Sequence, residues 1–131
     1  MNDEQARQVV IARLLEKANQ AVVSARSVHA AGDIGLASNR IYYACFYALS
    51  AVLLNQRIQF GKHGSVRAAL HQQLVKTGRI SRELGRFYDT VFSERQEADY
   101  NALAAFDAAI VAQRIESAAA FVARMKELLG A

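Results

Sequence analysis

Residues 34–55 have the sequence IGLASNRIYYACFYALSAVLLN, and this stretch determines the architecture of the chain. Its apolar side chains recur at steps of three and four residues, which is the spacing of one helix face. Two such stripes run along it: Tyr42, Phe46, Leu49 and Leu53 form one, and Leu36, Tyr43, Tyr47 and Leu54 form the other. A helix that is apolar over so much of its circumference lies at the centre of a bundle or against a partner chain.

Signals of helix termini divide the rest of the chain into four further helices. The 131 residues contain no proline, and several glycines stand where helices should end. The predicted helices cover residues 3–31, 33–55, 65–77, 81–100 and 107–129, with N-caps at Asp33, Ser65, Ser81 and Asp107. We therefore predict an all-α, up-and-down bundle of four to five helices in one domain spanning residues 1–131.

The first and last predicted helices are long and carry narrow apolar seams. Such seams suit antiparallel pairing, so we expect these two helices to form a frame, with the third and fourth helices packed on one flank. The seams are Ile11, Leu14, Ala18, Ala21, Ala25 and Val28 in the first helix, and Val111, Ile115, Ala118, Val122, Met125 and Leu129 in the last.

Composition indicates a cytoplasmic protein that does not enter a membrane. Cys45 is the only cysteine, so no intrachain disulfide can form, and it is expected to be an inert core residue. The N-terminus is polar and does not resemble a signal peptide. The longest apolar run, residues 41–54, is too short to cross a bilayer and carries three tyrosine hydroxyls.

The formal net charge of +4 is unevenly distributed. Between Arg57 and Arg86 the acid Glu83 stands alone against seven basic residues. This asymmetry is compatible with contact to phosphate or nucleic acid, and also with a solvated helix face. The basic residues are Arg57, Lys62, Arg67, Lys76, Arg79, Arg82 and Arg86.

Arg95 occupies a position where helical periodicity places an apolar residue. Leu84, Tyr88 and Val91 share one helix face, and the next step of four reaches Arg95. A guanidinium on such a face must be paired or must line a cleft, because an unpaired buried charge is costly. Asp99, one turn further on, can orient or neutralise it.

Arg40 repeats this anomaly on the central helix, where it shares a face with Tyr43 and Tyr47. The two arginines are predicted to face one crevice, in which phenol hydroxyls and Asp99 would hold their guanidinium groups. The alternative is an internal polar network with no ligand, because ion-pair networks resemble active sites.

His63 follows the central helix within the segment Gly61-Lys62-His63-Gly64. Its position is predicted to be a loop whose backbone amides, with Lys62, could receive an anion; the alternative is an exposed turn residue. His29 and His71 fall within helices without an obvious partner and are expected to be surface or packing residues. No spacing of His, Cys, Asp and Glu predicts a metal site, and no cofactor motif is present.

Four segments in order resemble the small prokaryotic subfamily of HEPN-domain proteins, over about residues 5–129. They are the central-helix stretch 39–48, the loop 61–64, residues 74–78 and residues 95–100. The resemblance implies a helical bundle that dimerises and is often encoded beside a minimal nucleotidyltransferase. Many HEPN proteins are metal-independent ribonucleases in which an arginine is followed a few residues later by a histidine, and two such sites meet across the dimer.

Arg95 matches the arginine of that motif, whereas Tyr100 stands in place of the histidine. A phenol titrates near pH 10 and is a poor general base at neutral pH, which argues against RNA cleavage. The resemblance also implies that a partner transferase can attach adenylate to a tyrosine near the motif, which makes Tyr100 a candidate acceptor.

Three hypotheses follow. In the first, a cleft around Arg95 binds a nucleotide or RNA, and the protein belongs to a toxin–antitoxin-type pair with a nucleotidyltransferase. In the second, the protein cleaves RNA, with catalysis by Arg95, Asp99 and either His63 or Tyr100. In the third, it is a purely structural dimer. The predicted binding residues are Arg40, Tyr43, Tyr47, Lys62, His63 and Arg95.

Overall fold

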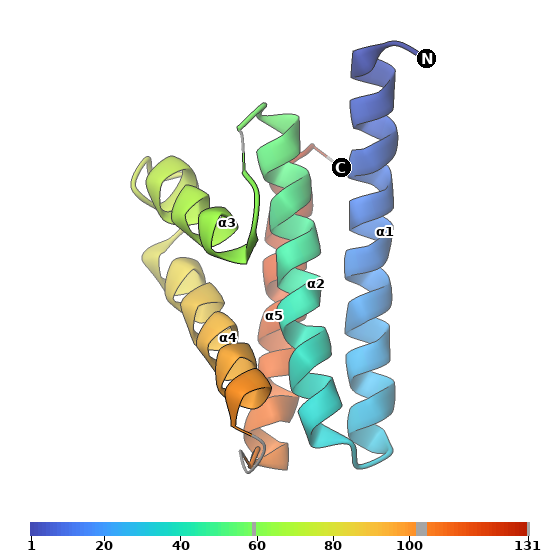
Figure 1. Ribbon diagram of the computed structural model, residues 1–131, viewed down its shortest axis with the longest axis vertical. Helices are drawn as coiled ribbons and strands as arrows, with labels where there is room; N and C mark the ends of the chain where they lie inside the picture. Colours follow the sequence, from blue (N-terminus) through green and yellow to red (C-terminus); the bar gives the residue numbers. More distant parts are fainter. Residues whose placement is uncertain (59, 102–104, 131) are drawn as a thin grey trace.

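The computed structural model describes residues 1–58, 60–101 and 105–130, and every regular element within them is helical (Figure 1). An all-α bundle is therefore confirmed. The elements are α1 (Asp3–Ala30), α2 (Ile34–Asn55), α3 (His63–Ala69), the π-helical segment η1 (Leu70–Val75), α4 (Arg82–Tyr100) and α5 (Ala108–Leu128).

Three of the predicted N-caps are confirmed. The side chains of Asp33, Ser81 and Asp107 each accept a hydrogen bond from the backbone N–H three residues on, at 3.1, 3.1 and 2.9 Å. Each bond satisfies one of the N–H groups that a helix leaves without an internal partner. Gly32 and Gly78 have φ angles of 88° and 78°, a left-handed conformation that suits the chain reversal after a helix.

The predicted start of the third helix is wrong. The helix begins at His63, two residues earlier, and Ser65 is not its N-cap. The Ser65 hydroxyl instead accepts a hydrogen bond from the Gly61 N–H at 2.8 Å and donates one to the Lys62 carbonyl at 3.0 Å. His63 therefore lies in a helix rather than in a loop, and one of the amides expected to receive an anion is already used.

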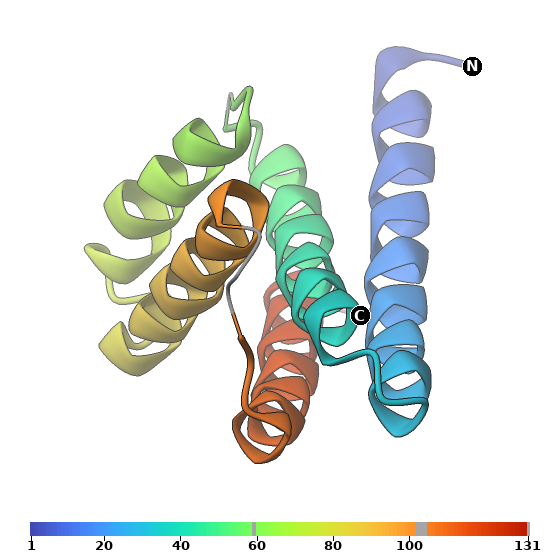
Figure 2. The ribbon, with the colours of Figure 1, turned by 60° about the horizontal axis from the view of Figure 1, so that its bottom comes forward.

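The centre of the bundle is α2, with α1 on one side of it and α3 and α4 on the other in both views (Figures 1 and 2). The helices α1 and α5 run in opposite directions, as expected, and α5 contacts α2 as well as α1. The first α2 stripe is the more deeply buried, since Tyr42, Leu49 and Leu53 have no exposed surface. In the second stripe, Tyr43, Tyr47 and Leu54 are half-buried and Leu36 is exposed.

A glycine in α4 lets η1 approach closely. A Cβ atom added at Gly85 would lie 2.9 Å from Val75 Cγ2 and 3.2 Å from His71 Cε1. The absence of a side chain there allows η1, and with it the adjoining α3, to pack against α4. This packing positions His63, the first residue of α3. Among the described residues, no helix is long and apolar enough to cross a membrane.

Candidate functional site

Arg95 lies at the end of the core-facing stripe of α4. Tyr88 and Val91, which precede it on that stripe, are 0% and 3% exposed. The Arg95 side chain is only 19% exposed, and its Nη2 lies 3.4 Å from Asp99 Oδ2. The guanidinium is therefore largely withdrawn from water and has one carboxylate at ion-pair distance.

Two tyrosine rings of α2 hold this guanidinium. Its central carbon lies 5.0 Å from the ring centre of Tyr42 and 5.4 Å from that of Tyr43. A flat, delocalised cation stacks well on aromatic faces, which favours arginine over lysine at this place.

The hydrogen-bonding capacity of Arg95 is not filled. A guanidinium has five N–H donors, and the Nε of Arg95 is buried without an acceptor among the described residues. Buried polar groups are usually hydrogen-bonded, so an exception needs an explanation. The buried Nε itself is out of a ligand's reach, but the two Nη groups have only Asp99 as a described ion-pair partner, and their surplus donors fit an anionic ligand.

A second arginine approaches the same tyrosine from α2 itself. The Arg40 guanidinium carbon lies 5.2 Å from the Tyr43 ring centre, and Arg40 Nε donates to Asn39 Oδ1 at 3.2 Å. The Tyr43 ring therefore contacts two cations from two helices. The structure brings Arg40, Tyr43, Arg95 and Asp99 together, and the positive charge exceeds the negative charge within this group.

His63 joins this group from the start of α3. Its Nδ1 lies 2.8 Å from the hydroxyl oxygen of Tyr42, within hydrogen-bond distance. Its ring packs on Phe46, with ring centres 4.5 Å apart, and meets the edge of Tyr43 at 5.9 Å. Tyr42 therefore connects Arg95 and His63, which lie on different helices.

Burial controls the ionisation of both hydrogen-bonded groups. It lowers the pKa of His63 below its usual 6.5, and the nearby Arg95 charge lowers it further while Asp99 acts in the opposite direction. Burial raises the pKa of the Tyr42 hydroxyl. Both groups are therefore neutral at pH 7, and His63 can accept or donate a proton there.

We expect Arg95→Ala to raise the pKa of His63 and Asp99→Asn to lower it, because the two charges act on His63 with opposite signs. A proton titration of the His63 ring by NMR, assigned with His63→Gln, measures both shifts. In the wild type, His63 has a lower pKa in the folded protein than in the unfolded chain, so the unfolded chain binds a proton first as the pH falls. The free energy of unfolding should therefore decrease as the pH drops through 6.5. Shifts of the same sign in both variants would contradict this electrostatic coupling.

The remaining predicted site residues lie outside this contact group. Tyr47 packs beside Tyr43 but faces Lys17, whose Nζ lies 5.4 Å from the Tyr47 ring centre. Lys62 is exposed next to His63. Tyr100, the last residue of α4, is 88% exposed. It is therefore accessible to another protein, unlike Arg95.

Tyr42 is the residue that sequence reasoning missed. It was assigned to the core stripe, and it is indeed fully buried. Its hydroxyl nevertheless binds His63 and its ring supports Arg95. A tyrosine where phenylalanine would fill a core was the available signal, because a buried hydroxyl needs a partner.

The other two histidines have partners, contrary to expectation. His29 Nε2 lies 2.8 Å from the carbonyl oxygen of Ala108, and His71 Nε2 lies 2.8 Å from Asp89 Oδ1. Arg67 Nε donates to the same Asp89 oxygen at 2.7 Å. Within the described ranges, no three His, Cys, Asp or Glu side chains are grouped so as to hold a metal ion.

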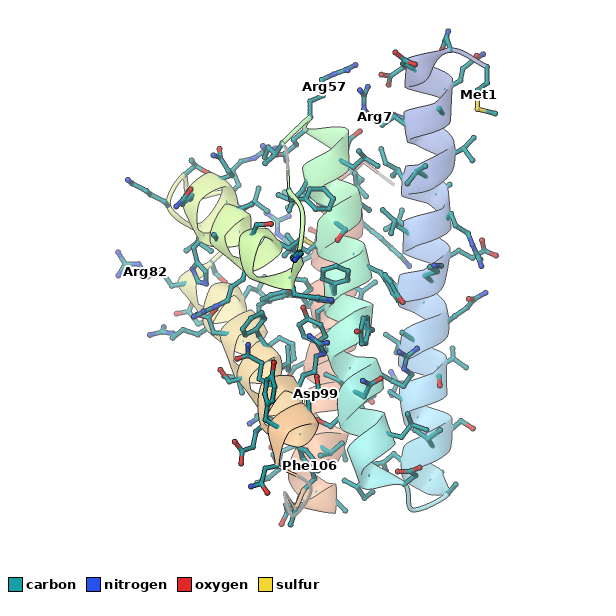
Figure 3. All side chains as sticks on the ribbon, in the orientation of Figure 1. Met1, Arg7, Arg57, Arg82, Asp99 and Phe106 are labelled. Carbon is teal, nitrogen blue, oxygen red and sulfur yellow. The ribbon has the colours of Figure 1, made fainter. Side chains whose placement is uncertain are left out.

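A surface hollow of about 470 Å³ lies between the start of α2 and the end of α4, and its described lining includes neither Arg95 nor Arg40. Its wall includes Asn39, which accepts from Arg40, and Asp99, which pairs with Arg95. Figure 3 shows Asp99 on the side of α4 that faces α2. The hollow is thus lined by the partners of both arginines, together with Gly35, Leu36, Ala98, Asn101 and Phe106.

Comparison with known proteins identifies the family. The family model described as HEPN domain matches residues 11–129, which is most of the chain. The chain belongs to the HEPN family. The resemblance of its four sequence segments to HEPN proteins is therefore confirmed, and the helices that carry Arg40, His63 and Arg95 all lie within the HEPN match.

Two similar proteins agree with this assignment. A protein of Thermotoga maritima named "UPF0332 protein" is 42% identical over 93 residues, which cover 71% of this chain and 70% of that protein. A protein of Methanocaldococcus jannaschii named "Putative toxin" is 31% identical over 90 residues, which cover 69% of this chain and 61% of that protein.

Proposed function

We propose that this HEPN protein binds the phosphate of an RNA strand or nucleotide at Arg95. The observation that carries the proposal is a largely buried guanidinium with unfilled donors, held against two tyrosine rings and only one carboxylate. Planar arginine groups suit phosphate because they offer paired N–H donors to its oxygens. Arg40, whose guanidinium carbon lies 5.2 Å from the Tyr43 ring centre, adds a second positive charge.

The surroundings of Arg95 suit a nucleotide better than an isolated phosphate. Tyr43 is half-buried, so part of its surface is open to stacking. Single-stranded nucleic acids are bound by basic grooves with aromatic side chains on which bases stack. A hollow of about 470 Å³ provides room next to Asn39 and Asp99, the partners of the two arginines.

We further propose that the protein works in a toxin–antitoxin-type pair with a minimal nucleotidyltransferase, which would adenylylate Tyr100. The name of the Methanocaldococcus relative, "Putative toxin", supports the toxin role. The 88% exposure of Tyr100 supports its access to a partner active site. The phenol oxygen would bond to the α-phosphorus of ATP, pyrophosphate would leave and the phenol proton would pass to solvent.

A second candidate function is RNA cleavage, and the placement of His63 favours it. The ribose 2′-oxygen would bond to the adjacent phosphorus while the bond to the 5′-oxygen breaks. His63 would take the 2′-hydroxyl proton, solvent would protonate the leaving oxygen, and Arg95 would stabilise the developing charge. Asp99 would orient Arg95 through their ion pair. In this mechanism Tyr100 is given no proton-transfer role, since its side chain is almost fully exposed.

Dimerisation is also part of the proposal. Tyr43 and Tyr47 are half-buried and Leu36 is 42% exposed, so one stripe of α2 stays partly open to solvent. A second copy packed on Leu36 and Tyr47, with the Tyr43 ring left open for the RNA, would bring two Arg95 sites near each other. The purely structural dimer remains the alternative if no RNA or nucleotide binds.

A labelled single-stranded oligoribonucleotide, mixed with the protein in EDTA, tests binding and cleavage together. We expect Arg95→Ala to weaken binding roughly 10- to 100-fold, because a charged hydrogen bond contributes about 1.5–3 kcal/mol. Arg13→Ala, which removes an exposed charge from α1, is the matched control and should bind like the wild type.

Fluorescence anisotropy reports binding in this experiment, and a denaturing gel reports the length of the RNA. Cleavage that His63→Gln abolishes would establish the ribonuclease function. Intact RNA bound by the wild type would establish the binding module. Equal affinities for the wild type and Arg95→Ala would refute a phosphate site at Arg95.

A further inference from the structure

The structure separates the basic run of residues 57–86 into paired and unpaired cations. Lys76, Arg79 and Arg82 form no ion pair with any residue in the described part of the chain, and all three are exposed. The paired members of the run are Arg57 with Glu4 at 2.7 Å, Arg67 with Asp89 at 2.7 Å and Arg86 with Glu83 at 3.5 Å.

Three of the four unpaired cations, Lys76, Arg79 and Arg82, gather around one surface hollow, and the fourth, Lys62, lies outside it. It has a volume of about 580 Å³ and lies where the end of η1, the start of α4 and α5 meet. Arg124 of α5, which pairs with Glu127 at 3.0 Å, adds a fourth basic residue to the wall, and no described acidic residue lines the hollow itself. The other lining residues are Val75, Gly78, Ile80, Ser81 and Leu84.

The turn that carries these cations is firmly attached to the bundle. The backbone N–H groups of Arg79 and Ile80 both donate to the Leu74 carbonyl, at 2.9 and 3.1 Å. Ile80 is only 4% exposed and anchors the turn in the core. Arg124 Nη2 donates to the Arg79 carbonyl at 3.1 Å. The backbone that carries these residues is therefore fixed, so binding a ligand there has to order only their side chains.

We propose that this hollow is a second RNA site, which binds backbone phosphates of the same strand whose phosphate lies at Arg95. The proposal rests on RNA binding at Arg95 as its starting point. A concave basic surface without acids attracts polyanions, and lysine and arginine contacts to phosphates do not depend on base sequence. The site would raise the affinity for long strands without selecting their bases.

The distance between the two sites sets the length of RNA that can reach both. Arg82 and Arg95 are 13 positions apart on α4, which is about 20 Å along the helix axis and about 220° around it. Figure 3 shows Arg82 at the start of α4 and Asp99 near its other end. At about 3.4 Å per stacked nucleotide, the axial distance alone takes about six stacked nucleotides, and the path around the helix takes more.

The double variant Arg79→Ala/Arg82→Ala tests the proposal, because both residues are exposed and lie outside the core. We expect it to weaken binding of a long oligoribonucleotide about tenfold. It should also flatten the plot of log affinity against log salt by about 1.4, since two phosphate contacts are lost. A dinucleotide, which is too short to reach both sites, should bind the variant and the wild type equally.

The control is Arg13→Ala/Arg86→Ala, which removes the same amount of charge from exposed positions outside the hollow. An equal loss of affinity in this control, or wild-type affinity and salt slope in the test variant, would overturn the proposal. Combining the test pair with Arg95→Ala separates the two sites. A further loss of affinity supports the hollow, even if Arg95→Ala alone has no effect and the Arg95 proposal fails.

Discussion

Replacing Tyr42 by alanine is expected to lower the free energy of unfolding by about 3–5 kcal/mol, as is usual for a large buried aromatic side chain. Tyr42 has no exposed surface. Its ring contacts residues of three helices, so a cavity at this position cannot be filled by a single neighbour. Urea unfolding followed by circular dichroism measures the change. The ring partners are Tyr43, Phe46, His63, Tyr88, Phe92 and Arg95.

The conservative variant Tyr42→Phe separates packing from hydrogen bonding. It keeps the ring and removes only the hydroxyl that meets His63 at 2.8 Å. A loss of about 1 kcal/mol is expected, because that is the typical net contribution of one hydrogen bond. If Tyr42→Ala were no less stable than Tyr42→Phe, the central packing role of the ring would be contradicted.

Tyr100→Phe is expected to abolish adenylylation completely when the protein is incubated with ATP and its partner nucleotidyltransferase. The wild type should gain the mass of one adenylyl group, because the exposed phenol oxygen of Tyr100 is the proposed acceptor. Intact-mass spectrometry detects the modification directly, and peptide mapping locates it.

The matched control is Tyr47→Phe, which removes a phenol from the half-buried stripe of α2. It should be adenylylated like the wild type. An unmodified wild-type protein, or a Tyr100→Phe protein that still gains the adenylyl mass, would exclude Tyr100 as the acceptor. The RNA-binding site at Arg95 would be unaffected by either result.

Helix positions were predictable because their determinants are local. Asp33, Ser81 and Asp107 each satisfy an N–H group only three residues away, so the residue type reveals the cap. The buried seam of α5 follows from its periodicity in the same way, and five of its six predicted members are buried. Leu129, the sixth, lies beyond the end of the helix and is half-buried.

The start of α3 and the form of η1 were mispredicted for two different reasons. Ser65 has the chemistry of an N-cap, but its hydroxyl serves the nearby Gly61 N–H and Lys62 carbonyl instead. The π-helical segment packs against Gly85 of α4, which lies on another helix. Sequence periodicity alone contains no information about such a contact.

Part of the candidate site was predictable, because that part is a local sequence pattern. A charge on an apolar helix face is a local pattern, so Arg40 and Arg95 could be identified from the sequence. Their meeting at the Tyr43 ring depends on how α2 and α4 pack. The hydrogen bond between Tyr42 and His63 joins residues 21 positions apart, and only the fold reveals it.

The NMR signal of the Arg95 guanidinium itself is the most direct test of phosphate binding at this residue. In isotope-labelled protein, the buried Nε–H of Arg95 gives a signal that Arg95→Ala removes, which assigns it. On titration with a short oligoribonucleotide, this signal should shift and saturate with the affinity measured by anisotropy. An unchanged Arg95 signal while RNA binds and shifts other residues would contradict a phosphate site at Arg95.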